Sequence, residues 1–267
     1  MNAGEGQMLF NFELTPLKAV EPWGTGDDRS LHWFGLTDGS YWLDVGDQRL
    51  FEYSAAARES GAPRYCSYQV VRLHEDVLEM TPAVLEAIPV DLIARISGRE
   101  GQQSVLRVSE WRGLSTEQDD DAFWSTLDGA QTWISKRHLD SLYLSPGVNV
   151  NMWSDAEFVH IEWDNSPKLV GEVCAWTAVN GSLHLPRAKF IEEVRSFHQR
   201  LIDQMAERVE NVLAGNVLPP EVQIDYPGLV REQARRSELL EAALRPASPT
   251  DWNAVRRSFA VVDATVA

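Results

Sequence analysis

The chain has 267 residues, of which 44% are hydrophobic and 24% are charged, a composition typical of a globular protein with a sizeable core. Its 40 Asp and Glu residues outnumber its 24 Lys and Arg residues, and the formal net charge is −16. Nucleic acids and anionic membrane surfaces attract basic protein faces, so this charge disfavours both as partners. It favours a basic protein partner, although the same charge also serves solubility alone.

The sequence predicts a cytoplasmic protein. Its N-terminal residues lack the basic stretch and the apolar stretch of a signal peptide, and no apolar run approaches the roughly 20 residues that span a bilayer. Cys66 and Cys174 lie far apart and in no metal-ligand spacing, so we expect reduced thiols. No catalytic or cofactor-binding motif stands out, and we expect no cofactor.

An aromatic segment covers residues 31–54, LHWFGLTDGSYWLDVGDQRLFEYS. The residues Thr37–Ser40 and Gly46–Asp47 favour tight turns, because their Asp-Gly and Gly-Asp pairs readily adopt positive φ. We therefore predict three short strands joined by two turns. In the middle strand, the alternation of side chains places Trp42 and Asp44 on one face and the apolar residues on the other.

A mostly helical section is predicted from about residue 65 to residue 144. Apolar residues follow a helical stripe through residues 66–80. The pair Thr81–Pro82 is typical of an N-cap followed by proline at the first helical position, so we predict that a new helix begins there. Three aspartates at 119–121 precede a further helical segment, where carboxylates stabilise a helix N-terminus. Gly129 is predicted to divide that segment.

A second β-meander is predicted over residues 148–185, where Asn180–Gly181 favours a hairpin turn into the last strand. The longest helix follows over residues 186–214, because apolar residues recur there at three- and four-residue steps. Two more helices are predicted near residues 228–244 and 251–260.

Together these elements predict an α+β fold. It consists of two antiparallel β-meanders, a helical middle section, a long amphipathic helix and C-terminal helices. We expect one continuous domain over residues 1–267, in which residues 221–267 form a helical C-terminal extension.

Several sequence blocks, taken together, resemble a known family. The segments PWG, LHWFGLTDGSYW, YQVVRL, LDSLYL, VHIEWDN and WTAVNG are similar to a bacterial family of uncharacterised cytoplasmic proteins, a domain of unknown function. The resemblance extends from about Pro16 to Val212. It implies no known activity, so no catalytic residue follows from it. By analogy, related small acidic proteins include immunity partners of bacterial toxins, which implies a binding function of that kind.

The segment HIEWD at residues 160–164 carries the main candidate for chemistry. In a strand, alternation places His160, Glu162 and Asp164 on one face, and imidazole and carboxylate groups are ligands for zinc, iron or manganese. The same alternation also predicts an ordinary half-exposed strand, with the intervening residues in the core and the polar residues in water. A metal-dependent enzyme with a site at these three residues is therefore the alternative hypothesis.

The residues predicted to bind a partner are acidic or aromatic. Trp and Tyr are enriched at the energetic centres of interfaces, and carboxylates complement the charge of a basic partner. Trp42 shares a strand face with Asp44, and Trp111 stands among polar residues. The full candidate set is Trp42, Asp44, Trp111, Asp119, Asp120 and Asp121.

The leading functional hypothesis is a non-enzymatic acidic binding protein that neutralises or regulates a basic protein partner, such as a bacterial toxin bound by its immunity protein. An enzyme is the less favoured class, because no catalytic motif accompanies the acidic composition. A homo-oligomeric scaffold is a third class, and the oligomeric state does not follow from the sequence.

Overall fold

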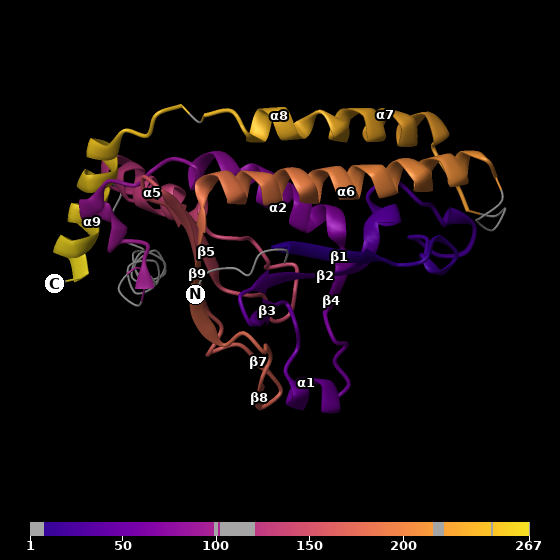
Figure 1. Ribbon diagram of the computed structural model, residues 1–267, viewed down its shortest axis with the longest axis horizontal. Coiled ribbons are helices and arrows are strands. Elements are labelled where there is room, and N and C mark those ends of the chain that lie inside the picture. The colour runs from indigo at the N-terminus through magenta and orange to yellow at the C-terminus, as the bar shows by residue number, and fades with distance from the viewer. Residues whose placement is uncertain (1–7, 99–100, 102–120, 216–221, 247, 267) are drawn as a thin grey trace.

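The computed structural model describes residues 8–98, 101, 121–215, 222–246 and 248–266. The fold is α+β, as predicted. Two antiparallel sheets lie on one side of the helices α2 (Val70–Val84) and α6 (Arg187–Leu213), and the helices α7 (Tyr226–Ser237) and α8 (Leu239–Ala243) lie on the other side (Figure 1). The polypeptide is therefore layered, with α2 and α6 between the sheets and the helices α7 and α8.

The first sheet is built around one long strand, β2. Its strands are β1 (Phe10–Leu14), β2 (Asp38–Val45), β3 (Gln48–Leu50) and β4 (Cys66–Gln69). β1 pairs along one side of β2, while β3 and β4 pair with the other side, all antiparallel. Residues of β2 alternate between buried and half-buried, as a sheet with one face on the core requires. The turn into β3 contains Gly46 with a φ of 77°, which confirms the second predicted turn.

The prediction of a first strand and turn within residues 31–54 is wrong. Residues 31–37 form turns and a short 3-10 helix, Gly35–Thr37, and β2 has already begun at Asp38. Gly39 pairs with Leu14 of β1, and a Cβ atom on Gly39 would collide with the backbone of that strand. The Asp-Gly pair thus permits a close strand contact with a distant segment, where local sequence favoured a turn.

The second sheet contains three strands in the order β5 (Val150–Ser154), β6 (Phe158–Asp164) and β9 (Asn180–Pro186). The short strands β7 (Leu169–Val170) and β8 (Val173–Cys174) pair with each other as a separate hairpin in the segment of chain that connects β6 to β9. The predicted hairpin turn at Asn180–Gly181 is wrong, because both residues pair with β6. Gly181 lies opposite Trp163, and a Cβ atom there would lie 2.5 Å from the indole ring. Glycine therefore makes room for the indole.

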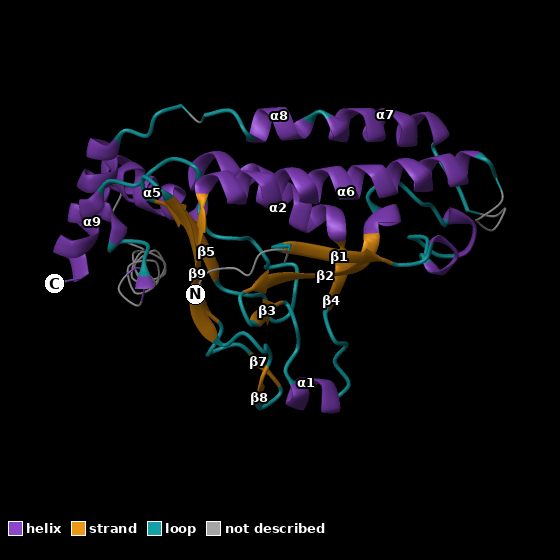
Figure 2. Cartoon of the chain, in the orientation of Figure 1, coloured by secondary structure: helices purple, strands orange, loops and turns teal. Residues whose placement is uncertain are grey.

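The remaining helices are α1 (Ala55–Glu59), α3 (Val90–Ile93), α5 (Asp121–Ser135) and α9 (Trp252–Val266), with 3-10 helices at Leu17–Ala19 and Gly26–Asp28 (Figure 2). The long helix α6 and the C-terminal helices confirm the predicted amphipathic segments. Within the described residues, no helix combines the length and apolar character that crossing a bilayer requires.

Three predicted helix boundaries are wrong. The stripe from residue 66 begins as β4, which pairs with β2. α2 does not restart at Thr81–Pro82 but continues to Val84, and the Thr81 hydroxyl donates a hydrogen bond to the Val77 carbonyl at 2.6 Å. That hydroxyl is bound to its own helix and does not cap a new one. α5 continues through Gly129, where a Cβ atom would lie 2.7 Å from the Ser258 hydroxyl.

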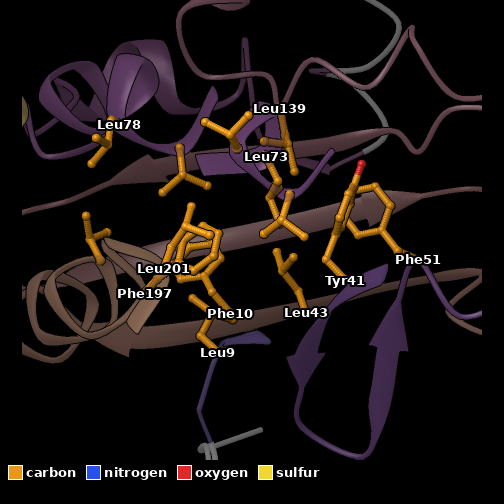
Figure 3. Close-up of a cluster of buried hydrophobic side chains, with 14 of the residues drawn as sticks. Leu9, Phe10, Tyr41, Leu43, Phe51, Leu73, Leu78, Leu139, Phe197 and Leu201 are labelled. Atoms are coloured by element: carbon orange, nitrogen blue, oxygen red, sulfur yellow. The ribbon is translucent and has the colours of Figure 1, made fainter. Parts of the chain in front are cut away.

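The main hydrophobic cluster lies between both sheets and the helices α2 and α6 (Figure 3). Phe10 of β1 stacks on Phe197 of α6 with ring centroids 5.3 Å apart, and Tyr41 of β2 packs edge-on against Phe51 at 5.2 Å. A smaller cluster joins α3, α5 and α9 to Trp153 of β5. The main cluster buries one face of the second sheet, and the smaller cluster packs on Trp153, which lies beside His160 on the other face. The polar residues of β6 on that outer face remain partly exposed among the described residues.

Candidate functional site

The outer face of β6 carries the polar residues of the HIEWD segment. His160, Glu162 and Asp164 are partly exposed, whereas the residues between them are at most 4% exposed. The strand therefore has the alternation that both interpretations of this segment require. What separates the interpretations is the set of partners of the three polar side chains.

Each carboxylate on this face has its own hydrogen-bond donors. Glu162 accepts hydrogen bonds from the Ser97 hydroxyl at 2.9 Å and from the Gly98 backbone N–H at 2.6 Å. Asp164 accepts from the backbone N–H and the hydroxyl of Ser166, at 3.0 and 2.6 Å. These bonds fix the carboxylates in position while leaving further acceptor capacity, since a carboxylate accepts up to about four hydrogen bonds.

His160 is directed away from the two carboxylates. Its Nε2 lies 2.8 Å from Asp155 Oδ2, and its ring stacks on Trp153 with centroids 4.0 Å apart. Partial burial opposes the ionisation of Asp155, but the N–H of Phe158 and the imidazole of His160 outweigh it and lower the pKa of Asp155 to about 2. Within the described ranges, no three His, Cys, Asp or Glu side chains gather in an arrangement that suits a metal ion.

Glu162 and Asp164 line a pocket of about 500 Å³. Two residues apart on one strand, they are spaced by roughly 6.6 Å along the chain. The pocket is otherwise lined by small or polar residues and by one indole, and its described lining includes neither Lys nor Arg. The lining residues are Gly98, Glu162, Trp163, Asp164, Ser166, Asn180, Gly181 and Ser182. Its chemistry therefore favours a cation.

Trp163 contributes to this lining from the core side of β6, where its indole ring lies under Gly181. The residue is only 4% exposed, and its indole Nε1 has no acceptor among the residues that the structure describes. A buried N–H without an acceptor is costly, by roughly 1–3 kcal/mol.

Trp42 and Asp44 lie on the outer face of β2, as the alternation predicts, but both have partners within the chain. The Trp42 ring stacks on Tyr65 with centroids 4.2 Å apart. Asp44 forms an ion pair with Arg49 at 2.8 Å and accepts a hydrogen bond from Asn11. The charge of Asp44 is thus compensated by Arg49, and the two residues lie in another sheet from the pocket.

The other predicted partner-binding residues are Trp111, Asp119, Asp120 and Asp121. Trp111, Asp119 and Asp120 lie outside the described residues. Asp121 is the first residue of α5.

Sequence reasoning missed a second polar site around Asp76. The Asp76 carboxyl is buried and accepts a hydrogen bond from the Tyr143 hydroxyl at 3.2 Å, and the Tyr41 hydroxyl donates to Tyr143 at 3.2 Å. Burial raises the pKa of Asp76 to about 7, although the Arg72 guanidinium and the Tyr143 hydroxyl oppose the shift. Asp76 and Arg72 border a second pocket, of about 410 Å³, that also contains His138. Nothing in the local pattern of α2 signals this convergence, because its partners are distant in sequence.

A buried histidine pair was also missed. His74 Nε2 and His198 Nδ1 lie 3.0 Å apart between α2 and α6, and both residues are at most 4% exposed. Burial, together with the smaller effects of His198 and Arg236, lowers the pKa of His74 to about 3. Both imidazoles are therefore neutral near pH 7, which is the expected state of a buried pair without a carboxylate partner.

The fold and the pocket define an α+β protein whose polar sheet face presents two carboxylates to solvent. The chain belongs to the family described as "Family of unknown function (DUF5984)", which matches residues 9–258. No curated protein and no solved structure matches the chain. This assignment is consistent with the expectation of an uncharacterised family, and it brings no activity with it.

Proposed function

We propose that this chain is a non-enzymatic acidic binding protein that neutralises or regulates a basic protein partner. The observation that supports the proposal is the pocket lined by Glu162 and Asp164, which contains two carboxylates and no described Lys or Arg. The most specific form of this proposal is that the partner is a bacterial toxin and the chain is its cytoplasmic immunity protein.

The physical argument has two parts. The net charge of −16 attracts a basic partner at long range and speeds its encounter with the chain. At short range, an arginine or lysine side chain in the pocket forms charge-assisted hydrogen bonds with carboxylates that are already oriented by Ser97, Gly98 and Ser166. Carboxylates held in place before binding lose less conformational entropy when the partner arrives.

The test compares wild-type protein with the double variant Glu162→Gln and Asp164→Asn. Each protein is immobilised, exposed at low salt to lysate of the native cell, and the affinity of the retained basic protein is then measured after purification. We expect the double variant to weaken binding at least about tenfold, since charged pairs at the centre of an interface contribute strongly. The matched control replaces two exposed carboxylates on α6, Glu207→Gln and Glu210→Gln, and should change binding less than about twofold.

Two outcomes contradict the proposal. One is equal affinity of the double variant and the control. The other is stoichiometric metal in the purified protein that disappears when His160, Glu162 and Asp164 are replaced, since that result favours the metal-dependent enzyme.

A further inference from the structure

The two edges of the second sheet differ. The outer edge of β5 is occupied by two segments from elsewhere in the chain: the Ile88 N–H donates to the Ser154 carbonyl at 2.8 Å, and the Leu139 N–H donates to the Val150 carbonyl at 2.9 Å. β9 is the last strand on the other side, and it pairs only with β6 among the described strands. Among the residues that the structure describes, the sheet therefore ends in one covered edge and one open edge.

The backbone groups at the open edge can be assigned from the ladder. The Asn165 N–H donates to the Val179 carbonyl at 2.6 Å, and antiparallel hydrogen-bonded pairs recur at every second residue. Gly181 and Leu183 consequently bond to β6, whereas the N–H and C=O groups of Ser182 and His184 point outward. No described group forms a hydrogen bond with those outward groups.

Away from Pro186 at its end, the open edge lacks the usual protection. Natural sheets guard exposed edges with charged residues, bulges or covering segments, because free backbone groups invite another strand. β9 has the sequence NGSLHLP, without a charged residue, and its first three residues are exposed. An unprotected edge beside a specific pocket is the arrangement used when an extended peptide adds to a sheet.

The pocket lies directly beside this edge. Asn180, Gly181 and Ser182 belong both to the first half of β9 and to the pocket lining, and Ser182 lies opposite Glu162 in the β6–β9 register. A strand added to β9 would lie about 4.8 Å beyond it. An arginine opposite Ser182 would then reach over that small side chain to Glu162.

We infer that the partner binds by adding an extended basic segment to the open edge of β9, with an arginine or lysine side chain in the pocket of Glu162 and Asp164. The inference rests on the proposed function for the charge of the partner, and it adds the conformation of the bound segment and the strand that receives it. Main-chain hydrogen bonds hold the segment, and the pocket selects its basic side chain.

The test separates the contribution of backbone hydrogen bonds at the β9 edge from the contribution of charge in the pocket. The probe is a synthetic peptide of about eight residues that alternates arginine and valine, compared with the same peptide N-methylated at every second residue and with a glutamate–valine peptide. On the protein side, Ser182→Pro removes the outward N–H while leaving the ladder with β6 intact, and Ser182→Ala is the matched control.

We expect Ser182→Pro and N-methylation each to weaken binding of the arginine peptide at least about tenfold, and Ser182→Ala to change it less than about twofold. The amide hydrogens of Ser182 and His184 should exchange at least about tenfold more slowly in the complex. The glutamate–valine peptide should bind at least about tenfold more weakly. The N-methylated peptide keeps the test decisive if Ser182→Pro fails to fold.

The experiment distinguishes failure of this inference from failure of the proposed function. If Glu162→Gln with Asp164→Asn weakens the arginine peptide while Ser182→Pro and N-methylation do not, the edge inference is overturned and the proposed function stands. If the charge variant has no effect, the proposed function fails. No measurable binding of the arginine peptide overturns the inference. So does a dimer that forms at low salt and neutral pH and that Ser182→Pro dissociates, because the edge then serves a second copy.

Discussion

At the scale of single residues, folding shifts the pKa values of Asp76 and of His74, one of the histidine pair, in opposite directions. Asp76 is buried with a hydrogen bond from Tyr143, and its nearest cation, Arg72, lies 3.5 Å away, which is too long for a strong hydrogen bond. Its pKa is raised to about 7, while the pKa of His74 is lowered to about 3. Folding therefore favours protonated Asp76 and neutral His74.

The first prediction concerns Asp76→Asn. Because the folded pKa of Asp76, about 7, lies above its ordinary value of 3.8, the folded chain holds a proton that the unfolded chain releases. Its contribution to stability is full below pH 3.8 and is lost as the pH rises through 7. The advantage of the variant over wild type should grow between pH 4 and 7, by at most about 1.4 kcal/mol per unit, and level off above.

Urea denaturation at pH 4, 5, 6, 7 and 8 checks this prediction. An advantage that is the same at every pH would contradict it. The contribution of His74 to stability depends on pH in the opposite direction. Because its pKa is lowered in the folded chain, that contribution is lost as the pH falls below 6.5. The wild-type curve should consequently be flatter than that of Asp76→Asn between pH 4 and 6.5.

The second prediction concerns Gly39. A Cβ atom at this position collides with the backbone of β1, so Gly39→Ala should separate β1 from β2 and destabilise the fold by about 1–3 kcal/mol. Ser67→Ala, at an exposed position of β4 in the same sheet, is the control and should change stability by less than about 0.5 kcal/mol. Thermal and urea unfolding measure both, and equal stability of the two variants would refute the steric account.

At the scale of elements, α7 is attached to the rest of the fold mainly by polar contacts. Only Leu229 and Arg236 of this helix are buried. The Arg236 guanidinium lies 2.6 Å from Glu75 and 4.5 Å from the ring centroid of Trp33. Trp33 in turn donates its indole N–H to Gln233 at 2.7 Å. One arginine thus joins α7 to both α2 and the aromatic segment after β1.

The third prediction follows from this attachment. Arg236→Ala should destabilise the protein by about 1–3 kcal/mol, because it leaves Glu75 with only the longer, 3.9 Å contact to Arg72 and Trp33 without its stacked guanidinium. Amide exchange should accelerate in α7 more than in α2. Arg236→Lys keeps the charge but not the planar group, and its effect should be intermediate. Equal acceleration throughout the chain would indicate global destabilisation and not release of α7.

The helices and strands differ in how far they could be predicted from the sequence. α6 was predicted because its apolar residues repeat through seven turns of local pattern, and the face of β6 was predicted because alternation is also local. The pairing of Gly39 with Leu14 and of Gly181 with Trp163 depends on segments that are distant in the chain, so Asp-Gly and Asn-Gly were wrongly predicted as turns. The candidate site likewise has one part that local sequence predicts and one part that depends on distant pairing. Glu162 and Asp164 follow from the strand pattern, whereas the pocket requires the register with β9.

At the scale of the whole molecule, the net charge of −16 acts on every partner before contact. The fourth prediction is that the association rate of the basic partner falls at least about tenfold between 0.05 and 0.5 M salt, while dissociation changes less, because salt screens the approach more than the closed contact. Stopped-flow or surface-based kinetics at several salt concentrations measure both rates. An association rate that is independent of salt would exclude long-range attraction as the cause of binding.

The open edge of β9 has a consequence for the protein when no partner is bound. A strand edge without charged residues also accepts a strand from a second copy of the same chain, which is the first step of aggregation. Mutual repulsion between strongly acidic copies opposes that encounter. The charge that attracts a basic partner is therefore also what keeps the unbound molecules apart, and high salt or a pH near the isoelectric point should make the free protein self-associate through β9.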